Sequence, residues 1–411
     1  MAAPKRGYAV HRSRVLLVAT LLLQGCGGST LPSSTPPAAP TASSAVPASV
    51  PISPTPAPTP PPTPTPTPVP LVASPTDGVL ESPPDAARPV VAVMIDDAPA
   101  ARPQSGLADA DVIVQAPAEG GIPRYLALYQ SRPAPSIGPI RSSRRYFLGW
   151  AAGWKPLYAH VGGAPNALAA IRAMNGSSIW DADEFVYASY MPRIATRFPP
   201  HNVYSSTSQL DALASRLGVP AAPPTSWTFE DPSPAADRPV GGSLIVPYPA
   251  GVIGYGYDAV SNRYLRSVDG TPQLDAGTNA RVAPADVVVM YVAVGPLANS
   301  PGESTNQAKG RLEVGYIGSG SALVFANGVE VAARWSKASD DAPLLFTFRS
   351  GPNLGQPVPF VRGQVVIQVV PTGTRVTYRA GMLPSTPAPP VPGSPAASGA
   401  PGGAAPSPGP S

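Results

Sequence analysis

The distribution of proline limits which parts of this chain can fold. The chain has 411 residues and 60 prolines, and residues 27–87 are dominated by Pro, Thr, Ser, Ala and Val. The alternating Pro-Thr sequence at residues 62–68 favours polyproline II and cannot bury a core. The uncharged segment 384–411 has a similar composition. We therefore expect a disordered tether at residues 26–87, a disordered tail at residues 384–411 and folded structure between them.

Residues 1–25 are typical of a bacterial lipoprotein signal peptide. Four basic residues precede an apolar run at residues 15–23, which is about half of the ~20 residues that a membrane span needs. Cys26, the single cysteine of the chain, lies where such a signal places its acylated residue. We predict that Cys26 is lipidated, for instance with palmitate, and anchors the chain to the cell membrane in an extracytoplasmic location. A plain secretory signal is the alternative.

The charge balance agrees with removal of this segment. The chain has 28 Lys+Arg and 24 Asp+Glu, and four of the basic residues but none of the acids precede Cys26. The mature chain would therefore have 28 − 4 = 24 basic residues against 24 acids. We predict membrane lipid as a partner. We predict no nucleic acid, because a neutral chain lacks the positive field that attracts nucleic acids. A single cysteine allows no internal disulfide, so the exported fold must depend on its core.

Residues 88–383 are numerous enough for two domains. In residues 88–235, strand-like and helix-like patterns alternate, which predicts an α/β domain. We expect strands at 89–95, 111–115, 124–130 and 157–161, and helices at 142–150, 165–174 and 208–217. Ser142 or Ser143 would cap the first helix, and Gly218 would end the third.

Residues 236–383 instead have short apolar runs separated by Gly, Pro and Asn, which predicts a mostly β domain. The candidate strands are 243–246, 262–266, 287–294 and 312–314. The strongest local prediction is a hairpin at residues 322–333, because Asn327-Gly328 suits a type I′ turn with positive φ at both central residues. Residues 362–369 and 374–379 are predicted to form a second hairpin.

Polar residues gather at the ends of the predicted strands in the first domain. Asp96 and Asp97 follow an apolar strand, and ligands of open α/β sheets bind outside the carboxyl ends of strands. Glu119 precedes two glycines, and Arg124 lies five residues later. Glu119 and Asp96 are therefore candidate catalytic groups. The structural alternative is that one of the aspartates pairs with Arg102 and that Glu119 pairs with Arg124.

Arg141 and Arg144 are three residues apart at the start of a predicted helix, so their side chains share a face. Guanidinium groups beside the free N–H groups of a helix N-terminus suit a carboxylate or phosphate ligand. Their acceptor could equally be Asp96 or Glu119 within the protein. We slightly favour this internal pairing, because few other acids of the domain could balance the two arginines.

His160 and His201 are the only histidines after the signal, and with Asn202 they are candidate ligand-binding residues. Their spacing matches no metal motif, so we predict no metal and no cofactor. Lipidation of Cys26 would leave no cysteine nucleophile. The chain also lacks the Ser-x-x-Lys, Gly-x-Ser-x-Gly, His-Glu-x-x-His and phosphate-loop motifs, which excludes the corresponding enzyme classes.

Several ordered motifs extend across the folded part. They are Val-Met-Ile-Asp-Asp (93–97), Arg-Pro-Gln-Ser-Gly-Leu (102–107), Glu-Gly-Gly (119–121), Gly-Pro-Ile-Arg-Ser-Ser-Arg (138–144), Tyr-Ala-His-Val-Gly-Gly (158–163) and Pro-His-Asn (200–202). This order resembles the YerB-like family of predicted bacterial lipoproteins, a domain of unknown function. Residues 318–320, Asn327-Gly328 and Trp335 resemble its C-terminal domain. The resemblance implies a lipoprotein in two parts and supplies no reaction. It also implies Asn at position 97 and an acid at position 115, where this chain has Asp97 and Gln115.

The leading hypothesis is a membrane-anchored cell-envelope lipoprotein whose polar cleft binds cell-wall glycan or peptide. The expected cleft residues are Asp96, Glu119, Arg124, Arg141, Arg144, His160, His201 and Asn202. One alternative is an envelope-glycan hydrolase or lyase that uses Glu119 and Asp96 as paired carboxylates. Another is an extracytoplasmic protein-interaction adaptor, which would require an exposed apolar patch.

Overall fold

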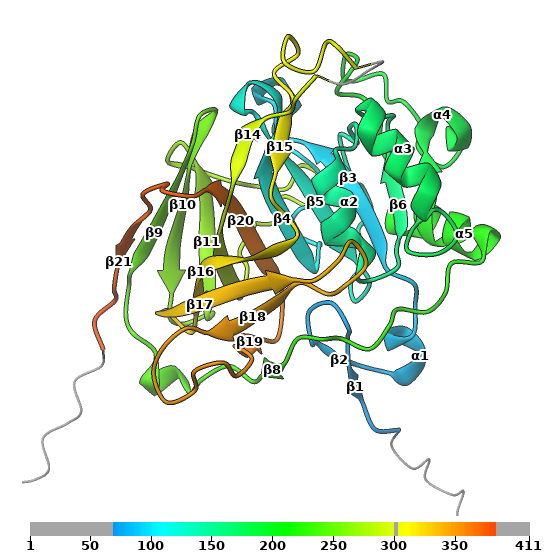
Figure 1. The fold of residues 1–411 in the computed structure, drawn as a ribbon. Helices are drawn as coiled ribbons and strands as arrows, with labels where there is room; N and C mark the ends of the chain where they lie inside the picture. The colour runs from blue at the N-terminus through cyan, green and yellow to red at the C-terminus, as the bar shows by residue number, and fades with distance from the viewer. Residues whose placement is uncertain (1–68, 300–302, 384–411) are drawn as a thin grey trace, which may run out of the picture. The chain divides into compact units, whose positions relative to one another are not determined.

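The computed structural model describes residues 69–299 and 303–383 (Figure 1). The predicted signal peptide, Cys26, residues 26–68 of the predicted tether and the tail at residues 384–411 lie outside the described residues. In the part of the chain that is described, every helix is too short or too polar to cross a membrane.

Secondary-structure elements of the first part begin before the predicted domain and alternate between strands and helices. They are β1 (Val72–Ala73), β2 (Leu80–Glu81), α1 (Pro83–Ala86), β3 (Val91–Asp96), η1 (Pro99–Ala101), β4 (Val112–Pro117), η2 (Glu119–Gly121), β5 (Pro123–Tyr129), α2 (Arg145–Ala152), β6 (Leu157–His160), α3 (Pro165–Met174), β7 (Trp180–Asp183), α4 (Glu184–Tyr187) and α5 (Thr207–Leu217).

Strands dominate the second part. Its elements are β8 (Phe229–Glu230), η3 (Ala235–Asp237), β9 (Ser243–Tyr248), β10 (Gly251–Asp258), β11 (Arg263–Val268), β12 (Thr271–Pro272), β13 (Asp286–Val292), β14 (Val294–Pro296), β15 (Leu312–Val314), β16 (Gly318–Ala326), β17 (Val329–Lys337), β18 (Leu345–Phe348), β19 (Phe360–Val361), β20 (Val365–Pro371) and β21 (Thr377–Arg379).

One large sheet connects the two parts. Its ten strands have the order β18-β17-β16-β13-β20-β4-β5-β3-β6-β7. The junction is a parallel pair, in which Val365 of β20 lies opposite Val112 of β4. A second, antiparallel sheet has the order β12-β11-β10-β9-β21. The strands of the large sheet cross the middle of the fold in Figure 1. Side chains from both parts therefore contribute to the same buried layers.

Each face of the large sheet has its own hydrophobic core. On one face, Phe147 and Trp150 of α2 and Ile171 of α3 pack against strand residues such as Met94 and Leu126. On the other face, α5 and the five-stranded sheet cover the alternate strand residues, among them Ile95, Tyr125 and Val289. Because side chains alternate along a strand, neighbouring residues of β3 and β5 point into different cores. This alternation separates Asp96 from Asp97 at the end of β3.

The fold prediction is confirmed in part: the described residues form two consecutive parts, and they are mostly β. The finer prediction, a first part of α/β type, is not established. β5 pairs antiparallel with both β3 and β4, whereas β3 pairs parallel with β6. The sheet of the first part is therefore mixed, and it continues into the second part without an edge. A division into domains at residues 235 and 236 stays a prediction.

Local sequence signals correctly predicted several elements. α3 has Pro165 at its first turn, as its sequence indicated. α5 ends at Gly218, which has φ of 65°. At the β16–β17 hairpin, Asn327 and Gly328 have φ of 50° and 78°, so both occupy the left-handed region that a type I′ turn requires.

Three predictions are wrong. Residues 362–369 and 374–379 form no hairpin, because β21 pairs with β9, whereas β20 lies between β13 and β4. Neither Ser142 nor Ser143 caps α2, whose N-cap is Arg144 without a side-chain hydrogen bond. Residues 69–87 belong to the fold and not to a tether: Asp77 is fully buried, and its backbone oxygen accepts a hydrogen bond from Gly363 at 2.9 Å.

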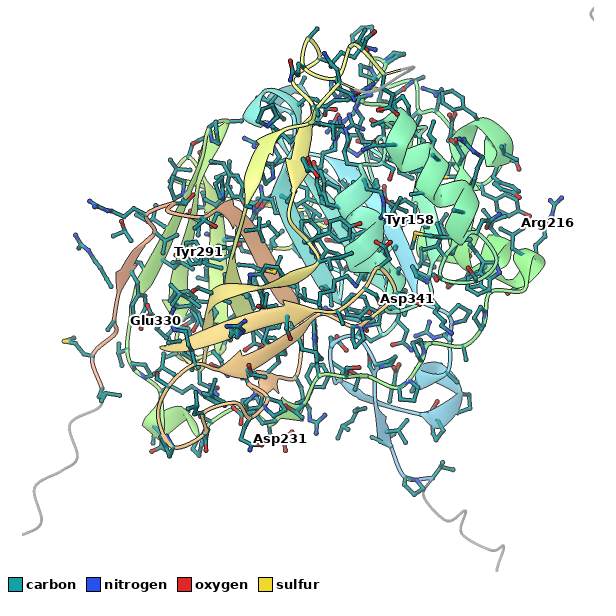
Figure 2. All side chains as sticks on the ribbon, viewed as in Figure 1. Tyr158, Arg216, Asp231, Tyr291, Glu330 and Asp341 are labelled. Carbon is teal, nitrogen blue, oxygen red and sulfur yellow. The ribbon has the colours of Figure 1, made fainter. Side chains whose placement is uncertain are left out.

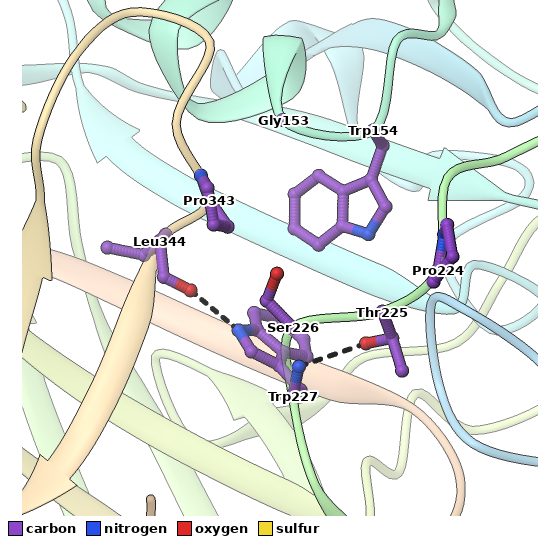
Figure 3. A pocket seen from close by; sticks show the side chains of 8 residues that line it. All are labelled: Gly153, Trp154, Pro224, Thr225, Ser226, Trp227, Pro343 and Leu344. Atoms are coloured by element: carbon purple, nitrogen blue, oxygen red, sulfur yellow. Dashed lines mark hydrogen bonds between the residues drawn. The ribbon is translucent and has the colours of Figure 1, made fainter.

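The connection between the two parts is fixed by aromatic packing (Figure 3). Trp227 Nε1 donates to the backbone oxygen of Leu344 at 2.7 Å, and the Trp227 ring lies edge-on to Trp154 with centroids 5.4 Å apart. Beside them is a cavity of about 20 Å³ that Gly153 and Pro343 also line. This volume is enough for about one water molecule, so we assign it to packing and not to ligand binding.

Candidate functional site

Asp96 lies at the carboxyl end of β3, directly opposite Arg124 of β5 in the strand register. Asp96 Oδ2 is 2.8 Å from His201 Nδ1 and 3.2 Å from Arg141 Nε. Asp96 Oδ1 accepts a hydrogen bond from the backbone N–H of Ala98 at 3.1 Å. Three segments that are distant in sequence therefore meet at one carboxylate.

Glu119 lies in the turn η2, between two guanidinium groups. Its Oε1 contacts Arg144 Nε and Nη2 at 2.6 and 2.5 Å, and its Oε2 is 3.4 Å from Arg124 Nη2. Burial raises the pKa of Glu119, but the charges of Arg144 and Arg124 outweigh burial and hold this pKa below its usual value. Burial and the like charge of Arg144 lower the pKa of Arg124 to about 10.

These contacts form two sets, and the strand pairing of Asp96 with Arg124 places the sets side by side. We call the six predicted site residues in the two sets the polar cluster. Its members are Asp96, Glu119, Arg124, Arg141, Arg144 and His201. The sequence slightly favoured internal pairing of the two arginines with Asp96 or Glu119, and the structure has the pairs Arg141–Asp96 and Arg144–Glu119. The pairing of Arg124 with Glu119 is present as well. With three arginines and two carboxylates, the polar cluster has an excess of positive charge.

Arg141 and His201 retain polar groups that no described residue uses. The Arg141 side chain is 29% exposed, and its guanidinium makes no hydrogen bond to a described residue. Its Nε lies close to Asp96 but is not aligned as a hydrogen-bond donor. His201 uses Nδ1 for Asp96, whereas Nε2 has no partner among the described residues, and the side chain is 19% exposed. Both groups could therefore contact a ligand.

The other two predicted ligand-binding residues are held inside the protein. The His160 side chain is fully buried, with Nδ1 2.9 Å from Gly162 O and Nε2 2.9 Å from Asp181 Oδ1. Asn202 Oδ1 accepts a hydrogen bond from Arg193 Nη1 at 3.2 Å. His160 lies on β6, which also carries Tyr158, labelled in Figure 2 in the region of α2 and α3. Both ring nitrogens of His160 are therefore used within the protein, and its role in ligand binding stays a prediction.

Asp97 is fully buried and belongs to a separate arrangement, which we call the Asp97 network. Asp97 Oδ1 accepts from Arg102 Nε at 2.9 Å and from Gln104 Nε2 at 3.0 Å, whereas Oδ2 accepts from Gln115 Nε2 at 2.8 Å. The pairing with Arg102 is the structural alternative that the sequence offered. Burial raises the pKa of Asp97, and the hydrogen bond from Arg102 only partly offsets this rise.

Arg266 completes the Asp97 network from the second part of the chain. Its side chain is buried and donates to Gln115 Oε1 at 2.6 Å, to Tyr255 Oη at 3.1 Å and to Tyr125 Oη at 3.3 Å. Sequence reasoning missed this residue. The signal was present, because Arg266 follows Tyr264 at the two-residue spacing of inward-facing positions on a strand.

The two positions that depart from the resembled family contact one another. Where Asn is expected this chain has Asp97, where an acid is expected it has Gln115, and the two side chains are hydrogen-bonded. Relative to what the resemblance implies, the carboxylate and the amide of this pair are in reversed positions. A mechanism that needs a carboxylate at position 115 would find it instead at position 97, whose side chain contacts Gln115.

The polar cluster does not assemble the ligand set of a metal ion. Among the described residues, no three His, Cys, Asp or Glu side chains come together in a way that could hold one. Asp96 and Glu119 each face guanidinium groups, which occupy the oxygens that a cation would need. The chemistry of the polar cluster therefore favours an anionic partner over a cationic one.

The fold and this arrangement of motifs define a two-part family of unknown function. Residues 77–220 match the family model "Protein of unknown function (DUF3048) N-terminal domain", and residues 244–367 match the corresponding C-terminal domain. The chain belongs to this family, as its resemblance to YerB-like proteins indicated.

Two comparisons with known proteins agree with this assignment. The chain is 28% identical over 290 residues to the "Putative lipoprotein YerB" of Bacillus subtilis, which covers 68% of this chain and 81% of that protein. It is also similar to the crystal structure of the YerB protein from Bacillus subtilis, with a TM-score of 0.63 and 25% sequence identity. That match covers 75% of this chain and 99% of the crystallised chain.

Proposed function

We propose that this chain is a membrane-anchored lipoprotein of the cell envelope and that its polar cluster binds an anionic group of a cell-wall glycan or peptide. Two observations support the location: the signal-like N-terminus ending at Cys26 and the similarity to a Bacillus subtilis protein named as a lipoprotein. The anchor is testable by detergent-phase partitioning. The chain should partition with detergent, and Cys26→Ser should leave the protein in the aqueous phase.

One observation carries the proposal of ligand binding. One buried donor of the polar cluster, Arg141 Nε, has no hydrogen bond to any residue that the structure describes. Unsatisfied buried polar atoms are costly, and native proteins keep them where a ligand or another role requires them. Arg141 and His201 contact the same oxygen, Asp96 Oδ2, so the groups that they leave unused lie near one another. Together with the excess of positive charge, they suit a carboxylate or phosphate.

The experiment measures capture of soluble cell-wall fragments by the purified chain. Arg141→Ala removes the available guanidinium, and we expect it to reduce binding at least tenfold without loss of fold. Arg144→Ala should also reduce binding, because Arg144 positions Glu119. The matched control is Arg172→Ala, an exposed arginine of α3 outside the cluster. Unchanged binding by both cluster variants would refute the assignment.

The enzymatic alternative is less well supported by the geometry. A glycan hydrolase needs one carboxyl group whose pKa is raised so that it can donate a proton. The pKa of Glu119 is instead lowered by two guanidinium groups, and Asp96 is occupied by His201 and Arg141. The adaptor alternative stays a prediction.

A further inference from the structure

A groove of about 350 Å³ lies outside the polar cluster, between the two parts of the chain. The segment Arg102–Pro103–Gln104 forms one side, and residues 268–274 around the β11–β12 turn form the other. We call it the Arg102 groove. Its volume falls near the lower end of the roughly 300–1,000 Å³ range of small-molecule sites, which leaves room for a few small residues of a peptide. The Arg-Pro-Gln motif that stood out in the sequence thus has a place in the structure but no role in the polar cluster.

Arg102, the cation of the groove, is held in place by a carboxylate. Arg102 Nε donates to the fully buried Asp97 carboxylate at 2.9 Å, whereas its two terminal nitrogens make no hydrogen bond to a described residue. Burial lowers the pKa of Arg102, but Asp97 outweighs it, so Arg102 remains charged. A guanidinium anchored through Nε presents both terminal nitrogens for a bidentate contact with a carboxylate.

The floor of the groove consists of side-chain amides. Gln104 is 1% exposed and Gln273 is 7% exposed. Gln273 Oε1 has no hydrogen bond among the described residues, and Gln273 Nε2 makes only long contacts, at 3.3 Å to Gln104 Oε1 and 3.5 Å to Tyr125 Oη. Because its contacts are weak, the Gln273 amide can rotate and accept a hydrogen bond from an N–H group of a ligand.

The walls are mostly apolar. Pro103 forms one wall, and Val268, Pro272 and Leu274 contribute to the other, with Leu274 41% exposed. Asp269 and Thr271 also line that wall, and Asp269 Oδ1 accepts a hydrogen bond from the backbone N–H of Val252 at 2.8 Å. Such walls accommodate small aliphatic groups and offer no deep pocket for a large side chain. These features match a peptide better than a sugar or a nucleotide. The groove offers an anchored cation, amides that can pair with peptide groups, and apolar walls.

We propose that the Arg102 groove binds the C-terminal end of a short peptide with small side chains, with its free carboxylate on Arg102 and its last peptide N–H groups over Gln273. This site goes beyond the proposed function, because it uses none of the residues of the polar cluster.

The test compares N-acetyl-Ala-Ala-Ala having a free carboxylate with the same peptide ending in an amide, by titration of the full chain. The acid should bind at least tenfold more tightly than the amide. Arg102→Gln keeps a donor for Asp97 but removes the charge, and it should abolish this preference. Leu274→Glu should weaken binding of the acid at least tenfold by repulsion, whereas the matched control Leu354→Glu, an exposed leucine outside the groove, should not.

Peptides of L-alanine and of D-alanine distinguish an ordinary protein C-terminus from a wall-type peptide, and tight binding of either acid supports the groove. Equal binding of acid and amide, or no binding of either at millimolar concentration, would overturn the proposal. Arg141→Ala separates the two sites, because it should leave peptide binding unchanged. If Arg141→Ala abolishes binding and Arg102→Gln does not, the peptide site is the polar cluster and the groove proposal fails. Thermal denaturation of Arg102→Gln identifies any loss of fold.

Discussion

The polar cluster and the Asp97 network begin at adjacent residues but hold their carboxylates by different means. Asp96 is buried and Glu119 is partly exposed, and both face guanidinium groups, so charge dominates there. Asp97 is fully buried and is held mainly by amide and guanidinium hydrogen bonds within the core. The difference indicates that the two regions have different roles. The cluster keeps unsatisfied groups that a ligand can use, whereas the network joins the two parts of the fold and positions Arg102.

We expect the largest effect on stability from the removal of Arg266. This change tests whether the Asp97 network is structural. Arg266→Met would remove the donor to Gln115 Oε1, one donor to each of the Tyr125 and Tyr255 hydroxyls, and one of the two positive charges near Asp97. Breaking a buried charge network typically costs about 3–5 kcal/mol. We expect a loss of that size in the free energy of unfolding, measured by urea denaturation at pH 7.

Arg141→Met is the matched control, because it removes an arginine from the polar cluster whose guanidinium is largely free. Its effect on the free energy of unfolding should stay within about 0.5 kcal/mol, as for most partly exposed positions. If the two variants lose similar stability, the distinction between a structural network and a binding cluster is wrong.

A second, smaller effect concerns the exchange of amide and carboxylate at positions 97 and 115. In Asp97→Asn, the new amide N–H₂ would face Gln115 Nε2, so two donors would oppose each other. In Gln115→Glu, the new carboxylate would face Asp97 Oδ2, now 2.8 Å from Gln115 Nε2. In the double variant, the amide oxygen at position 97 can still accept from Arg102 and Gln104, and the amide N–H₂ donates to the new carboxylate at position 115.

We therefore expect each single variant to lose about 1–3 kcal/mol, in line with an unsatisfied or repulsive buried contact. The double variant should recover most of that loss, with a coupling energy of about 1–3 kcal/mol in a double-mutant cycle. Urea denaturation of the four proteins provides the measurement. Additive losses would show that the two positions do not share one hydrogen bond as described.

Sequence patterns predicted what depends on local chemistry. The Asn327-Gly328 turn, the Pro165 start of α3 and the Gly218 end of α5 each follow from the φ that one residue type prefers. Individual strands such as β3 were also predictable, because a continuous apolar run marks a strand that is buried on both faces.

Pairing between distant segments could not be predicted in the same way. The 362–379 segment has the turn and the apolar runs of a hairpin, yet β20 enters the middle of the large sheet, where its fully buried residues gain more than they would at an edge. Internal pairing within the polar cluster was also expected from the sequence, but which arginine pairs with which carboxylate needed the structure. Arg266 was missed because its partners, Gln115 and Tyr125, lie about 140 to 150 positions earlier in the chain.

The smallest expected effect is a difference in the sign of pH dependence between the two regions. The folded-state pKa of Glu119 is lowered, so its contribution to stability is present above the unfolded-state value near 4.5 and is lost as pH falls. The folded-state pKa of Asp97 is raised, so its contribution is present below about 3.8 and is lost as pH rises. The stability cost of Glu119→Gln should therefore grow from pH 4 to pH 7.5, whereas the cost of Asp97→Asn should shrink.

Urea denaturation of both variants and the wild-type chain at pH 4 and pH 7.5 measures these two costs. We expect the two costs to change in opposite directions over this interval, because the two pKa shifts have opposite signs. Changes of the same sign would mean that burial, and not the arginines, also governs Glu119. The polar cluster would then be an extension of the buried network, and Glu119 would regain the raised pKa that a proton donor needs.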